Sequence, residues 1–237
     1  EENVYAKMEG EQLALYDAHV QQMKQMLDGK SEAEFKSNKI QILAELTKLR
    51  QLCCDPALLF EDYKGESAKV QMCMDLIGNA VHGGHKVLLF SQFTTMLDRL
   101  AEQLKKLGID YYMLTGSVNK EKRMQMVDSF NKDDVPVFCI SLKAGGTGLN
   151  LTGADTVIHF DPWWNPAVEE QATDRAYRIG QKKKVQVIKL IMKDSIEEKI
   201  DALQTRKKLL SENVIEAGEV FVNQLSMEEL VELFQAE

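Results

Sequence analysis

Gln171, Arg175 and Arg178 are the residues whose types and spacing most clearly suit chemistry on a phosphate group. Their spacings of four and three residues predict one face of a helix over residues 166–178 that carries an amide and two guanidinium groups. Like charges this close repel one another unless an anion neutralises them, and the planar guanidinium fits phosphate oxygens. Spacing alone leaves a second interpretation equally open, a surface helix whose arginines pair with carboxylates such as Asp174.

A glycine-rich segment over residues 141–150 follows a β-rich run that ends at Ile140. Three glycines within four positions allow a tight turn whose backbone N–H groups point at an anion. The Walker A pattern GxxxxGK(S/T) is absent. Residues 29–31 read Gly-Lys-Ser, but Lys24 stands where the pattern needs its first glycine. Leu151 stands where a dinucleotide-binding fingerprint needs its third glycine. The segment alone is therefore either a phosphate-binding loop or an ordinary tight turn.

Small polar residues at residues 91–92, 115–117 and 141–146 all follow the predicted ends of strands. Hydroxyl groups and backbone N–H groups in such positions can hold nucleic-acid phosphates without reading bases. Arg123 and Lys143 would add positive charge nearby. Any nucleic-acid binding is therefore predicted to tolerate many sequences and to weaken with salt.

Alternating β-rich runs and amphipathic helices must position these residues. The alternation predicts βαβ units, and hence an α/β fold with a parallel sheet flanked by helices. Ligands of such sheets bind at the carboxyl ends of the strands, where the polar residues fall. The predicted strands span residues 86–90, 111–114, 135–140, 156–160 and 185–191, and the helices between them span 97–107, 119–130 and 166–178. Ahead of these we predict a strand over 4–8, helices over 11–27 and 39–53, and a polar linker over 60–66.

The charge distribution separates two parts of the chain. The net charge of −8 over 237 residues argues against a nucleic-acid partner. Residues 175–208, however, hold eleven Lys and Arg against four Asp and Glu, whereas residues 212–237 hold seven Glu and no Lys or Arg. One basic face can meet phosphates despite a negative total, although a solvated face beside an acidic helix explains the charges equally well. The four cysteines form no CxxC pair, which predicts reduced, buried thiols in an intracellular protein.

An ordered series of segments resembles the motifs of Swi/Snf-type ATPases within helicase superfamily 2. The segment QATDRAYRIGQ (171–181) closely resembles motif VI of that family. The others are LRQLCCDPALL (49–59) for the helical insertion, KVLLFSQF (86–93) for motif IV, LTGSVNKEKR (114–123) for motif IVa, SLKAGGTGLNLTGADTVIHFDPWWNP (141–166) for motif V and its extension, and SIEEKIDALQTRKKLL (195–210) for the brace helix. The series follows the family's order over nearly the whole chain. The sequence departs from the family in lacking the Walker A loop and the acidic DExH motif of the first lobe.

The resemblance implies a role for each matching residue. Arg175 and Arg178 would be the catalytic arginine fingers, acting on ATP that the absent first lobe holds together with Mg²⁺. Gly148, Asn150 and Gln171 would lie at the ATP site, and no metal ligand is implied in this chain. The DNA-binding residues would be Ser91, Gln92, Thr115, Gly116, Ser117, Arg123, Lys143, Ala144, Gly145 and Trp164. Trp163 is expected to pack in the core. Double-stranded DNA and the first lobe of the same protein are the implied partners, with RNA polymerase or another DNA-bound complex as a further candidate and no membrane.

The resemblance also implies an organisation and leaves two functions open. Residues 1–66 would be the helical insertion and linker, residues 67–193 a RecA-like lobe, and residues 194–237 the brace helix with an acidic helix. The first function is the second lobe of a DNA-dependent ATPase and double-stranded DNA translocase, inactive by itself. The second is a non-catalytic DNA- or protein-binding module with a vestigial ATPase lobe. The retained arginines favour the first, and the C-terminal segment resembles bacterial sequences, which suggests the cytoplasm rather than the nucleus.

Overall fold

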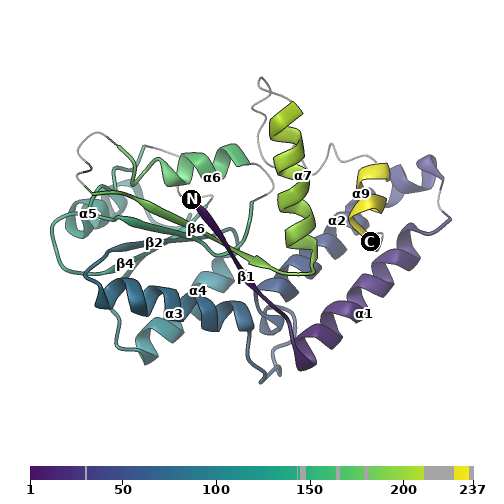
Figure 1. The fold of residues 1–237 in the computed structure, drawn as a ribbon, viewed down its shortest axis with the longest axis horizontal. Helices are drawn as coiled ribbons and strands as arrows, with labels where there is room; N and C mark the ends of the chain where they lie inside the picture. Colours follow the sequence, from purple (N-terminus) through teal and green to yellow (C-terminus); the bar gives the residue numbers. More distant parts are fainter. Residues whose placement is uncertain are drawn as a thin grey trace.

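A six-stranded, all-parallel sheet lies at the centre of the molecule (Figure 1). The computed structural model describes residues 1–237 except 30, 143, 145–147, 164–165, 179–180, 182, 211–226 and 235–237. The strand order is β1-β6-β5-β2-β4-β3, which confirms the predicted parallel sheet. The strands are β1 (Glu2–Ala6), β2 (Val87–Ser91), β3 (Tyr111–Leu114), β4 (Val137–Ser141), β5 (Thr156–His159) and β6 (Gln186–Met192).

Helices cover both faces of this sheet (Figure 1). Strands β2 and β4 are buried along their whole length, as the apolar runs VLLF and VFCI require when both faces are covered. Helices α3 (Ala68–His82) and α4 (Thr94–Lys106) pack on the face that carries Leu89 and Cys139. Helices α5 (Lys120–Phe130) and α6 (Pro166–Thr173) cover the opposite face, which carries Leu88 and Phe138. The alternation of neighbouring residues between the two faces is the period of a strand.

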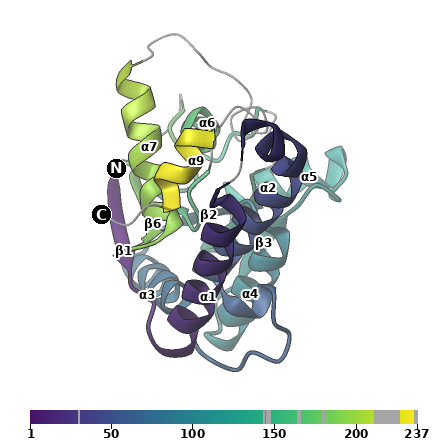
Figure 2. The same ribbon diagram turned by 90° about the vertical axis from the view of Figure 1, so that its right-hand side faces the viewer.

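A second core joins the remaining helices to one edge of the sheet. It is formed by α1 (Gly10–Leu27), α2 (Glu32–Cys54), α7 (Ile196–Leu210) and α9 (Met227–Phe234), which Figure 2 shows grouped beside β1 and β6. Ala6 of β1 and Met192 of β6 belong to the same core, so the helical part and the sheet share buried surface. A short 3₁₀ helix (Pro56–Leu58) follows α2. No helix within the described ranges is long and apolar enough to cross a membrane.

The predicted helix over residues 166–178 is too long, because α6 ends at Thr173. Beyond it the backbone changes to tighter turns, in which Arg175 N–H bonds to the carbonyl of Ala172 at 3.3 Å and Ala176 N–H to that of Thr173 at 3.0 Å. The carbonyl of Arg175 accepts instead from Leu151 N–H at 2.9 Å. The Arg175 carbonyl is therefore bonded to the residue that follows the glycine-rich segment, and it is not available to accept from a further turn of the helix.

Two other elements differ from their predicted extents. Helix α2 begins at Glu32 rather than near residue 39, because Ser31 and Glu34 form a capping box at its start. Helix α3 lies outside the predicted helices, and it begins where the hydroxyl of Ser67 accepts from Val70 N–H. Both helix starts carry a Ser cap three residues ahead of its partner, which is a signal that the sequence does contain.

Candidate nucleotide and nucleic-acid site

The central strands bring the candidate residues to one edge of the sheet. Ser91 at the end of β2 lies in register with Ser141 at the end of β4, and Phe90 lies in register with His159 at the end of β5. The segments that continue from these strands therefore leave the sheet side by side. This edge is the one at which parallel α/β sheets bind ligands.

Arg175 lies just beyond the end of α6 and has a largely buried side chain. Only 4% of the residue is exposed, and its Cζ stands 5.9 Å from the centre of the Phe90 ring. Its Nε donates to the carbonyl of Gln171 at 3.4 Å. Its Nη1 is buried and has no hydrogen-bond partner among the described residues. A buried guanidinium N–H without a partner is costly, so the site is suited to receive an acceptor.

Arg178 lies next to Arg175 and is exposed. Its Nε donates to the carbonyl of Asp174 at 3.2 Å, and its Nη1 donates to the carbonyl of Gly148 at 3.4 Å. Gly148 has a φ of 51°, in the left-handed region that favours glycine. The alternative pairing with the Asp174 carboxylate is not formed among the described residues, because the contact is with that residue's backbone.

A third arginine adds to the positive charge of this site. Burial, and then the charges of Arg178 and Arg123, together lower the pKa of Arg175 to about 10. Nε of Arg123 is itself buried without a hydrogen-bond partner. No ion pair joins any of these arginines to a carboxylate within the described part of the chain. Arg123, Arg175 and Arg178, here called the arginine cluster, therefore form an uncompensated cationic site.

A stack of rings lies under the arginine cluster. The ring of His159 stacks on Phe90 with centroids 5.5 Å apart, and its Nε2 lies 3.0 Å from the hydroxyl oxygen of Thr173. Burial, and then the charge of Lys189, lower the pKa of His159 to about 4, so the imidazole is neutral near pH 7. These contacts fix the end of α6, and Arg175 and Arg178 follow in the turns directly beyond it.

The remaining residues predicted at the ATP site lie around this cluster. Gln171 is exposed on α6, and its carbonyl is the acceptor for Arg175. Asn150 is exposed, and its carbonyl accepts from the side chain of Asn131 at 2.8 Å. The carbonyl of Gly148 accepts a hydrogen bond from Arg178. The structure thus brings Gly148 and Gln171 together with the two predicted finger arginines, while their assignment to ATP stays a prediction.

The residues predicted to bind DNA divide into exposed and buried groups. Gly116 and Ser117 are exposed beyond β3, and the hydroxyl of Ser117 lies 2.9 Å from that of Thr115. Ser91 is fully buried, with its hydroxyl donating to the carboxylate of Asp161. Ala144 is also buried, and its N–H bonds to the carbonyl of Ser141 at 3.0 Å.

Three further residues predicted to bind DNA, Lys143, Gly145 and Trp164, lie outside the described residues. Gln92 is half-buried, and its side-chain oxygen accepts from Arg50. Trp163 packs against the core of the sheet, as expected. The DNA-binding assignments as a whole stay predictions.

Sequence reasoning missed a second set of polar residues behind the strand ends. Arg50, Asp161 and Gln204 are buried, yet they contact the segments that follow β2 and β5. One signal was present, since Arg50 interrupts the apolar positions Leu49 and Leu52 of its helix. Its partner Pro162 lies 112 residues away, and no local pattern connects the two.

Comparison with known proteins identifies the family to which this arrangement belongs. Residues 68–180 match the helicase conserved C-terminal domain. The SWI2/SNF2 ATPase C-terminal domain of Sulfolobus solfataricus is 35% identical with a TM-score of 0.78, and the match covers 98% of this chain and 96% of that domain. The SWI2/SNF2 ATPase core of the same organism in complex with double-stranded DNA gives a TM-score of 0.81 at 35% identity, covering 100% of this chain and 50% of the core.

A curated relative extends the comparison to a longer protein. YwqA of Bacillus subtilis, whose name describes an ATP-dependent helicase/translocase, is 39% identical over 240 residues. The match covers 99% of this chain and 26% of YwqA, so the chain spans about a quarter of that relative's length. From the matched domain, the sheet and the solved structures together, the chain belongs to the SWI2/SNF2 family of helicase-like ATPases and forms their RecA-like C-terminal domain.

Proposed function

We propose that this domain is the second lobe of a DNA-dependent ATPase that moves along double-stranded DNA. It matches half of a SWI2/SNF2 core whose structure was solved with double-stranded DNA. In this proposal the other half of the core binds ATP, and the arginine cluster faces the phosphates across the cleft between the lobes. The relative described as an ATP-dependent helicase/translocase supports the use of ATP by the complete protein.

The observation that carries the proposal is the uncompensated charge of the arginine cluster. Arg175 is 4% exposed and keeps a buried Nη1 without a partner, and its neighbours Arg178 and Arg123 are cations. A site of this kind lowers the stability of the fold, because burial and repulsion both oppose the charged form. Such a cost is expected where the charges bind a ligand. A triphosphate would supply the missing negative charge and the missing hydrogen-bond acceptors.

The chemistry that suits these groups is phosphoryl transfer. Hydrolysis of ATP spreads negative charge over the transferring phosphoryl group, so catalysis is mainly positioning and stabilisation of charge. Arg178 is exposed and would meet the phosphates when the lobes close, whereas Arg175 lies deeper. Gly148, Asn150 and Gln171 would line the same site. Hydrolysis would then depend on closure of the two lobes.

Mg²⁺ enters this proposal with the nucleotide. We assign its binding to the first lobe, together with the β- and γ-phosphates. The chemistry that Mg²⁺ supplies is neutralisation of phosphate charge. The residues of this chain supply hydrogen-bond donors and positive charge from the opposite side.

The loops at the strand ends would hold the DNA backbone. Thr115, Gly116 and Ser117 are accessible for phosphate contacts. Gln92, directly after the end of β2, would donate to a DNA phosphate. Contacts of this kind position a protein on a duplex without reading its sequence. We propose double-stranded DNA and the first lobe as partners, with RNA polymerase or another DNA-bound complex as a further candidate partner.

The test is ATP turnover by the complete protein with and without double-stranded DNA. We expect DNA to stimulate turnover by the complete protein, and the isolated 237-residue chain to hydrolyse no ATP. The isolated chain should bind duplex DNA weakly, with an affinity that falls steeply as salt rises. Turnover by the isolated chain contradicts the need for a first lobe. A complete protein that binds DNA without hydrolysing ATP supports the alternative, a non-catalytic binding module.

A further inference from the structure

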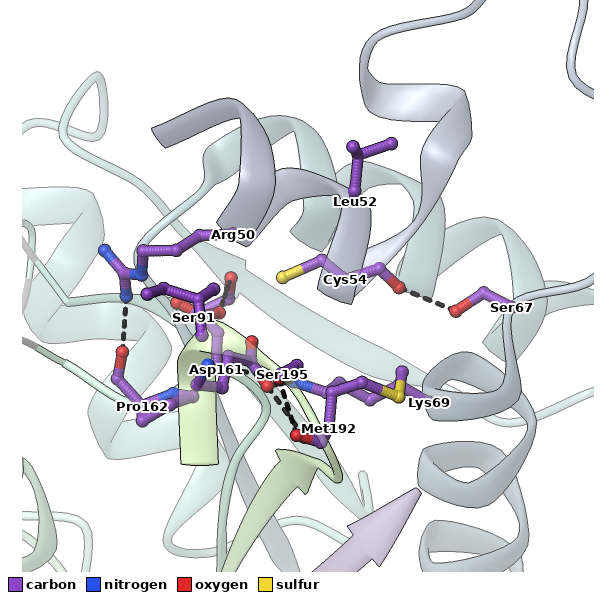
Figure 3. Close-up of polar contacts among 12 residues, drawn as sticks. Arg50, Leu52, Cys54, Ser67, Lys69, Ser91, Asp161, Pro162, Met192 and Ser195 are labelled. Carbon is purple, nitrogen blue, oxygen red and sulfur yellow. Dashed lines mark hydrogen bonds and ion pairs between the residues drawn. The ribbon is translucent and has the colours of Figure 1, made fainter. Parts of the chain in front are cut away.

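Arg50 crosses from helix α2 to the segments that follow β2 and β5. The residue is 2% exposed, and Figure 3 shows its guanidinium pointing from α2 toward the carbonyl of Pro162. Its Nη2 donates to that carbonyl, and its Nη1 donates to the side-chain oxygen of Gln92 at 2.8 Å. One buried side chain thus binds both strand-end segments at once.

Asp161 completes this contact from the side of the sheet. Its carboxylate accepts from the hydroxyl of Ser91 (Figure 3). It also accepts from Gln92 N–H at 3.2 Å. Burial lowers the pKa of Arg50 and raises that of Asp161, and in each case the charge of the other residue opposes the effect of burial. Arg50 and Asp161 therefore compensate each other within the fold, unlike the arginine cluster.

A second buried pair links the same region to the brace helix α7. Lys69 on α3 donates to Glu197 on α7, and both side chains are fully buried. The Glu197 carboxylate also accepts from Met192 N–H at 2.9 Å, at the end of β6. Farther along α7, the amide of Gln204 donates to the carbonyl of Trp163. The segment 161–163 is therefore held by α2 on one side and by α7 on the other.

The orientation of the Gln92 amide follows from its contact with Arg50. A guanidinium only donates hydrogen bonds, so it must hold the side-chain oxygen of Gln92 and leave the NH₂ group to donate elsewhere. That NH₂ group, Nε2, is buried and has no hydrogen-bond partner among the described residues. A buried donor without an acceptor is costly, and a phosphate oxygen that reaches it when the strand-end segments engage DNA would satisfy it.

We infer that Arg50 is a positioning residue for DNA engagement, because it fixes the Gln92 amide and the Pro162 carbonyl against helix α2. The inference rests on the proposed function, in which Gln92 contacts the DNA backbone. Movement of α2 or α7 would shift these groups together, and DNA held by them would favour one placement of the two helices. Arg50 itself lies behind the DNA-facing groups and touches neither nucleotide nor DNA.

The experiment compares three variants of the complete protein. Arg50→Lys keeps the buried positive charge but replaces the two-pronged donor with a point charge. Arg50→Met combined with Asp161→Asn removes both charges, so no ion is left buried without a partner. Arg99→Met is the matched control, since Arg99 forms an ion pair with Asp55 just after α2 and has no hydrogen bond or ion pair to the described part of the strand-end segments. The measurements are the melting temperature, ATP turnover without DNA, the KM for ATP, and the DNA concentration that gives half-maximal stimulation.

We expect Arg50→Lys and the double variant to keep the wild-type melting temperature, DNA-free turnover and KM for ATP. Their half-saturating DNA concentration should rise about tenfold, as expected when positioned hydrogen bonds to phosphate weaken. Arg99→Met should leave the DNA concentration unchanged. If Arg50 has only a structural role, every variant with a wild-type melting temperature should also show wild-type dependence on DNA. That result overturns the inference and leaves the proposed function standing. A wild-type protein that DNA does not stimulate overturns the proposed function as well.

Discussion

Arg50 and Arg175 are both buried arginines, and they differ in what surrounds them. Arg50 is 2% exposed and lies close to Asp161, and it donates to Gln92 and to the carbonyl of Pro162. Arg175 is 4% exposed and has two arginines as its charged neighbours. The fold supplies the partners of the first guanidinium and leaves Nη1 of the second without one in the described structure.

This difference separates a residue that holds the structure from one that awaits a ligand. A buried charge with its counter-charge costs little when the pair stays intact and much when one partner is lost. A buried charge without a counter-charge lowers stability at all times, and such groups gather at functional sites. The arginine cluster is therefore expected to affect function when altered, and the Arg50 contact to affect folding and the placement of loops.

The largest expected effect is on turnover after a change in the arginine cluster. Arg178→Ala in the complete protein should reduce DNA-stimulated kcat by about 10³-fold, the loss typical of an arginine finger. Because Arg178 would act chiefly on the transition state, ATP affinity and DNA binding should stay close to wild type. Arg178→Lys should restore little, since a point charge lacks the two-pronged donor.

The control for this prediction is the melting temperature of the same preparations. Arg178 is exposed, and its only described hydrogen bonds are to two backbone carbonyls. Its loss should therefore leave the melting temperature unchanged. Normal turnover by a well-folded Arg178→Ala protein removes the finger assignment. A fall in activity that merely follows a loss of folded protein would give Arg178 a structural role instead.

The next effect is on stability and should have opposite outcomes at the two buried arginines. Arg50→Met removes the larger of the two positive charges that act on the buried Asp161, which should cost about 3–5 kcal/mol of unfolding free energy. Arg175→Met removes an uncompensated cation, so the unfolding free energy should be no lower than that of the wild type. Urea denaturation of the 237-residue chain measures both. Equal losses for the two variants would mean that Arg175 has a structural partner and would weaken the comparison.

The strands were predictable because they depend on local patterns. VLLF and VFCI are short apolar runs between turns, and the structure places both in the buried centre of the sheet. The start of α2 was also encoded locally, in the capping box of Ser31 and Glu34. The end of α6 was not, since it depends on Leu151 N–H taking the carbonyl of Arg175. Tertiary hydrogen bonds of this kind overrule helix signals that the sequence alone contains.

The candidate site was predictable only in part, for the same reason. The spacing of Arg175 and Arg178 identified two members of the arginine cluster, but nothing local places Arg123 beside them. The contact between Arg50 and Pro162 joins residues 112 apart in sequence. Motif order identified the segments that meet at the strand ends, whereas burial and partners, which decide what each side chain does, required the fold.

Acid stability offers a third test, at the ring stack under the arginine cluster. The pKa of His159 is lowered from 6.5 to about 4 by burial, so protonation favours the unfolded chain. The stabilisation is present above pH 6.5 and is lost as the pH falls toward about 4, with a total on the order of 3 kcal/mol. His159→Phe should flatten the dependence of unfolding free energy on pH in this range. An unchanged slope in the variant would show that His159 titrates normally in the folded protein.

The smallest effect is the stabilisation of the arginine cluster by a simple anion. Inorganic pyrophosphate offers the negative charge and acceptors that this site lacks, and a ligand that binds only the folded state raises its stability. At about ten times its Kd this amounts to ~1.4 kcal/mol, or a rise in melting temperature of about 3–6 °C for a domain of this size. Chloride at matched ionic strength controls for screening, and Arg99→Met should keep the full rise. Arg178→Ala and Arg123→Ala should each reduce it, because each removes one cation from the cluster. An equal rise in wild type and in both cluster variants would mean that pyrophosphate binds elsewhere, and the cluster would then not be the phosphate site.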